Sequence, residues 1–113
     1  FEPDKTLTLK DLTKYLNGRY TLESINKCLN TKYTEKDADT PLTVKQVIIL
    51  LESYTYTDNL PMLSSAFKNQ DNDVYTNIAL NIGAIKNAEG LDNNATRMDL
   101  ANYVYKIIYG QNE

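Results

Sequence analysis

The chain has 113 residues, of which 42% are hydrophobic, and this length and composition fit one small globular domain with a modest core. Its formal net charge of −3 and its scattered lysines argue against the concentrated basic surface that nucleic-acid binding needs. We find no secretory signal and no apolar run long enough to span a bilayer, and we therefore expect no membrane insertion. Because the chain does not start with Met, we expect a mature protein or an excised domain.

The first expected helix covers residues 9–16. Thr8 precedes it as an N-cap, and Asp11 stands three residues later as the partner in a capping box. Its inward residues are expected at helical spacing, and Asn17-Gly18 should end it through a left-handed C-cap. The predicted inward residues are Leu9, Leu12, Tyr15 and Leu16.

A second helix is expected to begin after Thr21. Its apolar stripe consists of Leu22, Ile25, Cys28 and Leu29. The stripe predicts that Cys28 is buried as a small hydrophobic residue rather than acting as a nucleophile. Residues 30–41 are predicted to be a loop.

The third helix, residues 44–54, is apolar on nearly all sides, which is typical of a helix surrounded by others. We therefore predict that it is the central helix, with Thr43 as its N-cap. The sequence shows no sustained alternation of polar and apolar residues. We expect an all-α domain with at most a short extended pairing near residues 54–57.

Three further helices are expected in the second half of the chain. The fourth has Asp58 or Asn59 as its cap and Pro61 in its first turn, and a loop at 69–73 follows. The fifth covers residues 74–82 and ends at Gly83, and the last covers residues 97–109 and ends at Gly110. The inward residues of the fourth helix are predicted to be Leu60, Leu63, Ala66 and Phe67.

Three of these helix starts are alike. Thr8, Thr43 and Thr96 are each followed three residues later by Asp or Gln and then by an apolar residue. We interpret the similarity as an internal repeat of helix-loop-helix units. The predicted fold is a bundle of short helices in a single domain, built from pseudo-repeats at about 1–18, 19–57 and 58–113.

The third unit carries a resemblance to a known family. It contains, in order, the segments Ile82-Gly83-Ala84-Ile85, Glu89-Gly90-Leu91 and Ala95-Thr96-Arg97-Met98-Asp99. This order resembles the S-layer homology module, in which an aliphatic-Gly turn and a Gly-containing loop precede a Thr-Arg-Ala-Glu helix start. Phe1-Glu2-Pro3 looks like the Phe-x-Pro loop of an earlier copy.

The resemblance implies a function. Modules of that family pack in threes, and the grooves between them hold an acidic polysaccharide of the bacterial cell wall. By this resemblance, Arg97 would meet an anionic sugar group, with Thr96 and Asp99 fixing the helix start and Gly83 and Gly90 shaping the adjoining loop. Leu9 and Val44 stand where the other two copies would carry the arginine.

Catalysis and metal binding find little support. The chain has no His, which excludes Ser-His-Asp and Cys-His arrangements and His-containing zinc sites. Residues 69–73 offer alternating oxygen ligands but lack the later Gly and Glu of an EF-hand loop. The Asn94-Ala95-Thr96 sequon has no further support, because Thr96 is already assigned as a cap. We expect no enzyme activity, no metal and no cofactor.

Two functional hypotheses remain. The first is a non-catalytic module at the bacterial cell surface that anchors a larger protein by binding acidic wall polysaccharide. The second is a degenerate module of the same kind that acts as a structural or protein-interaction domain, with another surface protein as its partner. Both hypotheses place the protein outside the cell.

Overall fold

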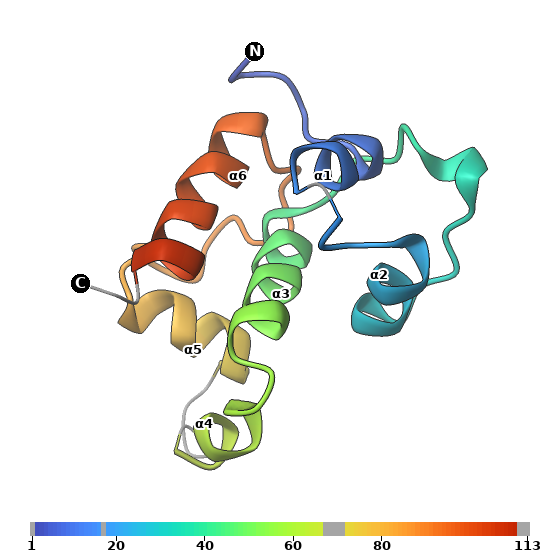
Figure 1. Ribbon diagram of the computed structural model, residues 1–113. Coiled ribbons are helices and arrows are strands. Elements are labelled where there is room, and N and C mark those ends of the chain that lie inside the picture. The colour runs from blue at the N-terminus through green and yellow to red at the C-terminus, as the bar shows by residue number, and fades with distance from the viewer. Residues whose placement is uncertain (1, 17, 67–71, 111–113) are drawn as a thin grey trace.

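The computed structural model describes residues 2–16, 18–66 and 72–110, and this part of the chain contains helices and no strands (Figure 1). The predicted all-α class is therefore confirmed. The α-helices are α1 (Leu9–Tyr15), α2 (Leu22–Leu29), α3 (Val44–Thr55), α4 (Leu60–Ala66), α5 (Val74–Asn81) and α6 (Arg97–Tyr103). A 3-10 turn, η1 (Glu35–Asp37), lies in the predicted loop, and a π-helical turn, η2 (Val104–Tyr109), continues α6.

Helix α3 is the centre of the fold, as its apolar sequence predicts. It contacts α2, α5, α6 and η2, which surround it in Figure 1. Val47, Leu50 and Leu51 on α3 are completely buried in the main hydrophobic cluster. Burial of such a side chain contributes about 1.5–3 kcal/mol relative to exposure, so α3 supplies much of the core.

The three predicted capping boxes are all present. The hydroxyl oxygens of Thr8, Thr43 and Thr96 accept hydrogen bonds of 3.1–3.2 Å from the backbone N–H groups three residues later. In return, the side chains at those later positions accept from the Thr backbone N–H groups. Each helix start thus satisfies two backbone donors locally.

The residues just before these three caps meet in the middle of the molecule. The N–H of Leu7 donates to the carbonyl of Ala95 at 2.8 Å, Ala95 donates to Leu42 at 2.8 Å, and Leu42 donates back to Leu7 at 3.0 Å. All three residues are completely buried. We call this closed cycle of hydrogen bonds the backbone triangle.

The first two N–H groups of each of these helices also donate to a carbonyl of another segment. Helix α6 donates to the segment before α1, α1 to the segment before α3, and α3 to the segment before α6. The six bonds are Arg97 to Lys5, Met98 to Pro3, Leu9 to Thr40, Lys10 to Ala38, Val44 to Asn93 and Lys45 to Leu91. Donors that a helix cannot satisfy internally are thus paired by long-range contacts, and the starts of α1, α3 and α6 are held together.

No extended pairing forms near residues 54–57, where the sequence allowed at most a short one. Residues 54 and 55 complete the last turn of α3, and Tyr56 is its C-cap. Extended pairing occurs instead around the backbone triangle, as single bridges between Thr6 and Thr96, Thr8 and Pro41, and Thr43 and Asn94. The β-branched and aromatic residues at 54–57 favoured a strand locally, but helical hydrogen bonding continued to the N–H of Tyr56.

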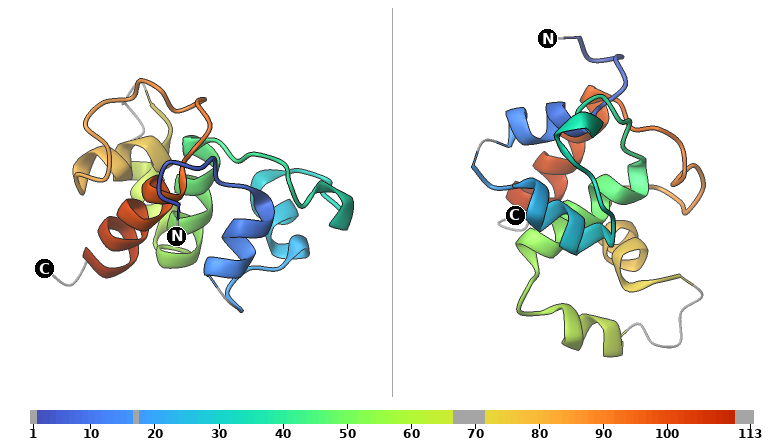
Figure 2. Two further views of the ribbon diagram at one scale, coloured as in Figure 1. Left: turned by 90° about the horizontal axis from the view of Figure 1, so that it is seen from above. Right: turned by 90° about the vertical axis from the view of Figure 1, so that its right-hand side faces the viewer.

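Several predicted core positions are more exposed than expected. Tyr15 ends α1 beside an open groove and is 37% exposed, and Cys28 is only half-buried at the end of α2. Helix α4 has no buried residue and lies at the end of the molecule away from α1 (Figure 1 and the right-hand view of Figure 2). Ala66 is exposed there, whereas Phe67 lies outside the described residues.

A buried carboxyl group lies on α3. Glu52 is completely inaccessible to solvent, and neither of its carboxyl oxygens has a hydrogen-bond partner among the described residues. Burial and the charge of nearby Asp73 raise the pKa of Glu52 to about 9, against the opposing charge of Lys45, which is ion-paired with Asp73. Glu52 is therefore protonated and neutral at pH 7.

Candidate functional site

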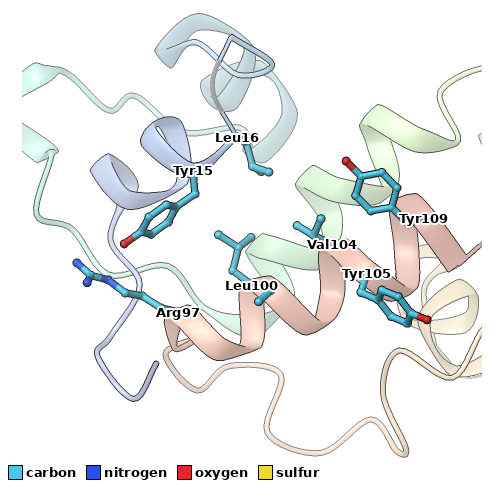
Figure 3. A pocket seen from close by; sticks show the side chains of 8 residues that line it. Tyr15, Leu16, Arg97, Leu100, Val104, Tyr105 and Tyr109 are labelled. Carbon is cyan, nitrogen blue, oxygen red and sulfur yellow. The ribbon is translucent and has the colours of Figure 1, made fainter. Parts of the chain in front are cut away.

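A groove of about 420 Å³ lies between α1 and the helix formed by α6 and η2 (Figure 3). Its floor is apolar, and tyrosine rings stand along its sides, so we call it the tyrosine groove. The residues that line it are Tyr15, Leu16, Arg97, Leu100, Ala101, Val104, Tyr105 and Tyr109. Figure 3 shows Arg97 at one end of this set and Tyr109 at the other.

The π-helical turn η2 presents two of the three tyrosines. Tyr105 and Tyr109 are each 54% exposed, while Ile107 between them is completely buried in the core. The turn therefore anchors itself through Ile107 and leaves the two rings at the groove. The final helix was predicted as a continuous α-helix, and π-helical turns of this kind are frequent at functional sites.

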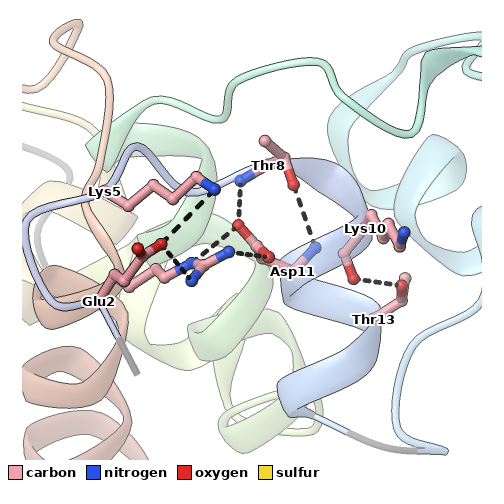
Figure 4. A network of polar contacts seen from close by, with 7 residues as sticks. Glu2, Lys5, Thr8, Lys10, Asp11 and Thr13 are labelled. Atoms are coloured by element: carbon pink, nitrogen blue, oxygen red, sulfur yellow. Dashed lines mark hydrogen bonds and ion pairs between the residues drawn. The ribbon is translucent and has the colours of Figure 1, made fainter.

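Arg97 is held in place by Glu2 of the N-terminal segment and by Asp11 of α1, two acidic residues that are labelled in Figure 4. Its Nη2 donates to Oδ1 of Asp11 at 3.0 Å and its Nε to Oδ2 of Asp11 at 3.3 Å, while Nη1 lies 3.7 Å from Oε2 of Glu2. The guanidinium carbon lies 5.7 Å from the centre of the Tyr15 ring, within cation–π range. The Arg97 side chain is only 16% exposed, and it keeps this restricted access while lining the groove.

Asp11 is the other half of this arrangement. Burial alone raises the pKa of its carboxyl group, but hydrogen bonds from Arg97 and from the Thr8 backbone, with the charge of Arg97, outweigh burial and lower it. Asp11 is thus a carboxylate at neutral pH. It acts as the capping-box residue of α1 and as the bidentate partner of an arginine on α6.

A second, more polar pocket of about 240 Å³ lies on the other side of this ion pair. Arg97 and Asp11 form part of its wall, and lysines from α1 and from the segment before α1 form much of the rest. We call it the lysine pocket. It is lined by Lys5, Thr8, Lys10, Asp11, Lys14, Asp39 and Arg97.

The other predicted site residues lie outside the tyrosine groove. Thr96 and Asp99 form the capping box of α6, which fixes the direction of the helix that carries Arg97. Gly83 and Gly90 have positive φ angles of 78° and 75°, which favour glycine, and they shape the chain between α5 and α6. Of the five predicted site residues, only Arg97 lines the groove in the part of the chain that the structure describes.

The tyrosines of the groove and the ion-pairing role of Asp11 were not predicted from the sequence. Tyr105 and Tyr109 are four residues apart, a spacing that places two side chains on one helix face and could have signalled a shared surface. Asp11 was assigned only a capping role, because its partner Arg97 is 86 residues away in the chain.

The described residues contain no cluster of His, Cys, Asp or Glu side chains that could hold a metal ion. The predicted loop at 69–73 lies mostly outside the described part of the chain, since 67–71 are not described. No described helix is both long enough and apolar enough to cross a membrane.

Comparisons of this chain with protein-family models, with curated proteins and with solved structures found no match. Its function is therefore inferred from the chemistry of the groove and from the sequence motifs.

Proposed function

We propose that this protein is a non-catalytic module of the bacterial cell surface that anchors a larger protein by binding an acidic wall polysaccharide. The observation that carries the proposal is the tyrosine groove, in which three tyrosine rings and one arginine surround an apolar floor. Ligand sites commonly combine such apolar walls with a few fixed polar groups.

The groove chemistry suits a sugar ring. The C–H groups on the face of a sugar can pack against the electron-rich face of a tyrosine, and the phenol hydroxyls can donate to or accept from sugar hydroxyls. Tyr15 contributes from one side of the groove, and Tyr105 and Tyr109 contribute from the other. An extended polymer could lie along the groove with Arg97 at one end.

The resemblance to S-layer homology modules agrees with this proposal. Thr96 and Asp99 hold the start of α6 and orient Arg97, while Gly83 and Gly90 allow the turns before it. The cyclic hydrogen bonding of the three capped helix starts supports an arrangement of three packed units, with the candidate groove between the first and the last.

A structural or protein-interaction module is the second candidate. Arg97 is already paired with Asp11 and Glu2, and Leu9 and Val44 replace the other two expected arginines. An arginine with internal partners can serve the fold without a ligand.

Binding to purified acidic wall polysaccharide, measured by sedimentation and calorimetry, tests the proposal. The double variant Tyr105→Ser/Tyr109→Ser should bind roughly tenfold more weakly, because it loses two aromatic stacking surfaces. Tyr54→Ser is the matched control, since Tyr54 is 49% exposed on α3 and does not line the groove. A wild-type protein without affinity for such polymers would leave the structural module as the better account.

A further inference from the structure

We infer that the anionic group of the bound polymer sits in the lysine pocket, on Lys10 and Lys14, and that the sugar ring beside it sits in the tyrosine groove. The inference rests on the proposed function and specifies which part of the site binds the anionic group and which part binds the sugar ring. It reassigns the principal anion contact from Arg97 to two lysines of α1.

The first reason is that Arg97 has little charge to offer a ligand. Its Nε and Nη2 atoms are bonded to the two carboxyl oxygens of Asp11, and Nη1 is close to Glu2. A carboxylate or phosphate binding to this guanidinium must compete with a bidentate, mostly buried partner that is already in place.

The second reason is that the lysines of α1 lack such partners. Among the described residues, an ion pair joins Lys5 to Glu2, but none joins Lys10 or Lys14 to a carboxylate. Lys10 and Lys14 are four residues apart and both line the pocket, so their ammonium groups can converge on one anion.

The third reason is local charge. The protein carries a net charge of −3, which repels a polyanion overall. The lysine pocket has four basic and two acidic side chains. Arg97 and Asp11 neutralise each other and Lys5 is ion-paired with Glu2, which leaves two lysines, Lys10 and Lys14, against Asp39. A polyanion therefore meets a locally positive surface here.

The two sites also adjoin each other. Arg97 lines both, and the ammonium group of Lys14 lies 5.9 Å from the centre of the Tyr15 ring, which belongs to the groove. A ligand that spans them needs an anionic substituent close to a ring with an apolar face. A polysaccharide carrying carboxylates or phosphates on its units has this chemistry.

The test compares Lys10→Gln/Lys14→Gln with the wild type, using polygalacturonate as a carboxylate polymer, dextran phosphate as a phosphate polymer and unmodified dextran as a neutral polymer. Calorimetry at low ionic strength should show that the variant binds the preferred anionic polymer about tenfold more weakly. The control Lys27→Gln/Lys86→Gln has the same change in net charge at two exposed lysines outside both sites, and its affinity should change less than about twofold. Whichever anionic polymer binds more tightly identifies the anion.

The outcomes separate the inference from the proposed function. If the lysine variant binds as tightly as wild type while Tyr105→Ser/Tyr109→Ser does not, the inference is overturned and the groove stands. If only the lysine variant loses binding, the pocket stands and the groove proposal is overturned. If the wild type binds neither anionic polymer, both are overturned.

Discussion

At the scale of single residues, two carboxyl groups are removed from solvent in opposite ways. Asp11 is paired with Arg97 and the backbone of Thr8, and its pKa is lowered. Glu52 has no hydrogen-bond partner among the described residues, and its pKa is raised to about 9. The first group therefore supports the fold as an anion, whereas the second is tolerated only in its neutral form.

Asp11→Asn should destabilise the protein, because it removes the negative partner of Arg97 while an amide oxygen can still cap α1. The midpoint of urea unfolding should fall, and it should fall much less when the same change is made in an Arg97→Leu background. Asp39→Asn, at an exposed carboxyl group in the lysine pocket, is the control. Equal losses in both backgrounds would show that the ion pair does not contribute.

Glu52 should make the protein less stable as pH rises. Between the unfolded pKa near 4.5 and the folded pKa of about 9, the folded state holds one proton more than the unfolded state. The contribution of this group to the free energy of unfolding is thus complete below pH 4.5. Above that pH the free energy of unfolding falls by about 1 kcal/mol per pH unit. Urea unfolding from pH 5 to pH 8 should show this slope in the wild type and a smaller one in Glu52→Gln. Glu35→Gln, at an exposed site in η1, should keep the wild-type slope.

At the scale of helices, much of the fold could be predicted from sequence. The capping residues Thr8, Thr43 and Thr96 locate the starts of α1, α3 and α6 because the signal is local and has a clear hydrogen-bonding cause. Helix ends are less well predicted, as the change to a π-helical turn after Tyr103 shows. What could not be predicted is the set of contacts between helices, including the ion pair of Arg97 with Asp11, because these depend on how distant segments pack.

Removal of one cap should act mainly on stability. Thr96→Ala should lower the free energy of unfolding by about 1 kcal/mol, the usual effect of losing an N-cap side chain. Thr96→Ser keeps the hydroxyl group and should retain most of that stability. Urea unfolding of the three proteins measures the effect, and an alanine variant as stable as the serine variant would contradict the capping role.

At the scale of the whole molecule, stability should be unevenly distributed. The backbone triangle is completely buried, whereas α4 has no buried residue. Elements with few buried contacts open locally, while central hydrogen bonds open only when the entire domain unfolds.

Native-state hydrogen exchange can test this contrast. The amides of Leu7, Leu42 and Ala95 should exchange only through global unfolding, with the corresponding free energy. The amide of Leu63, which donates to Asn59, should exchange through a local opening of lower free energy. Measurements in low concentrations of urea should show a strong urea dependence for the triangle and a weak one for Leu63. Similar protection at both places would mean that α4 unfolds together with the core.

The backbone triangle also affects how this protein is made. Its corners lie at residues 7, 42 and 95, so the cycle cannot close until most of the chain has left the ribosome. Until then, the first N–H groups of α3 lack their acceptors at residues 91 and 93. The first N–H groups of α1 already have acceptors at residues 38 and 40, but the hydrophobic core around them is incomplete. Contacts between residues far apart in sequence slow folding, since a large loop must be ordered before they form. The nascent chain should therefore remain open to proteases and chaperones until residue 95 has left the ribosome, and then fold as one unit.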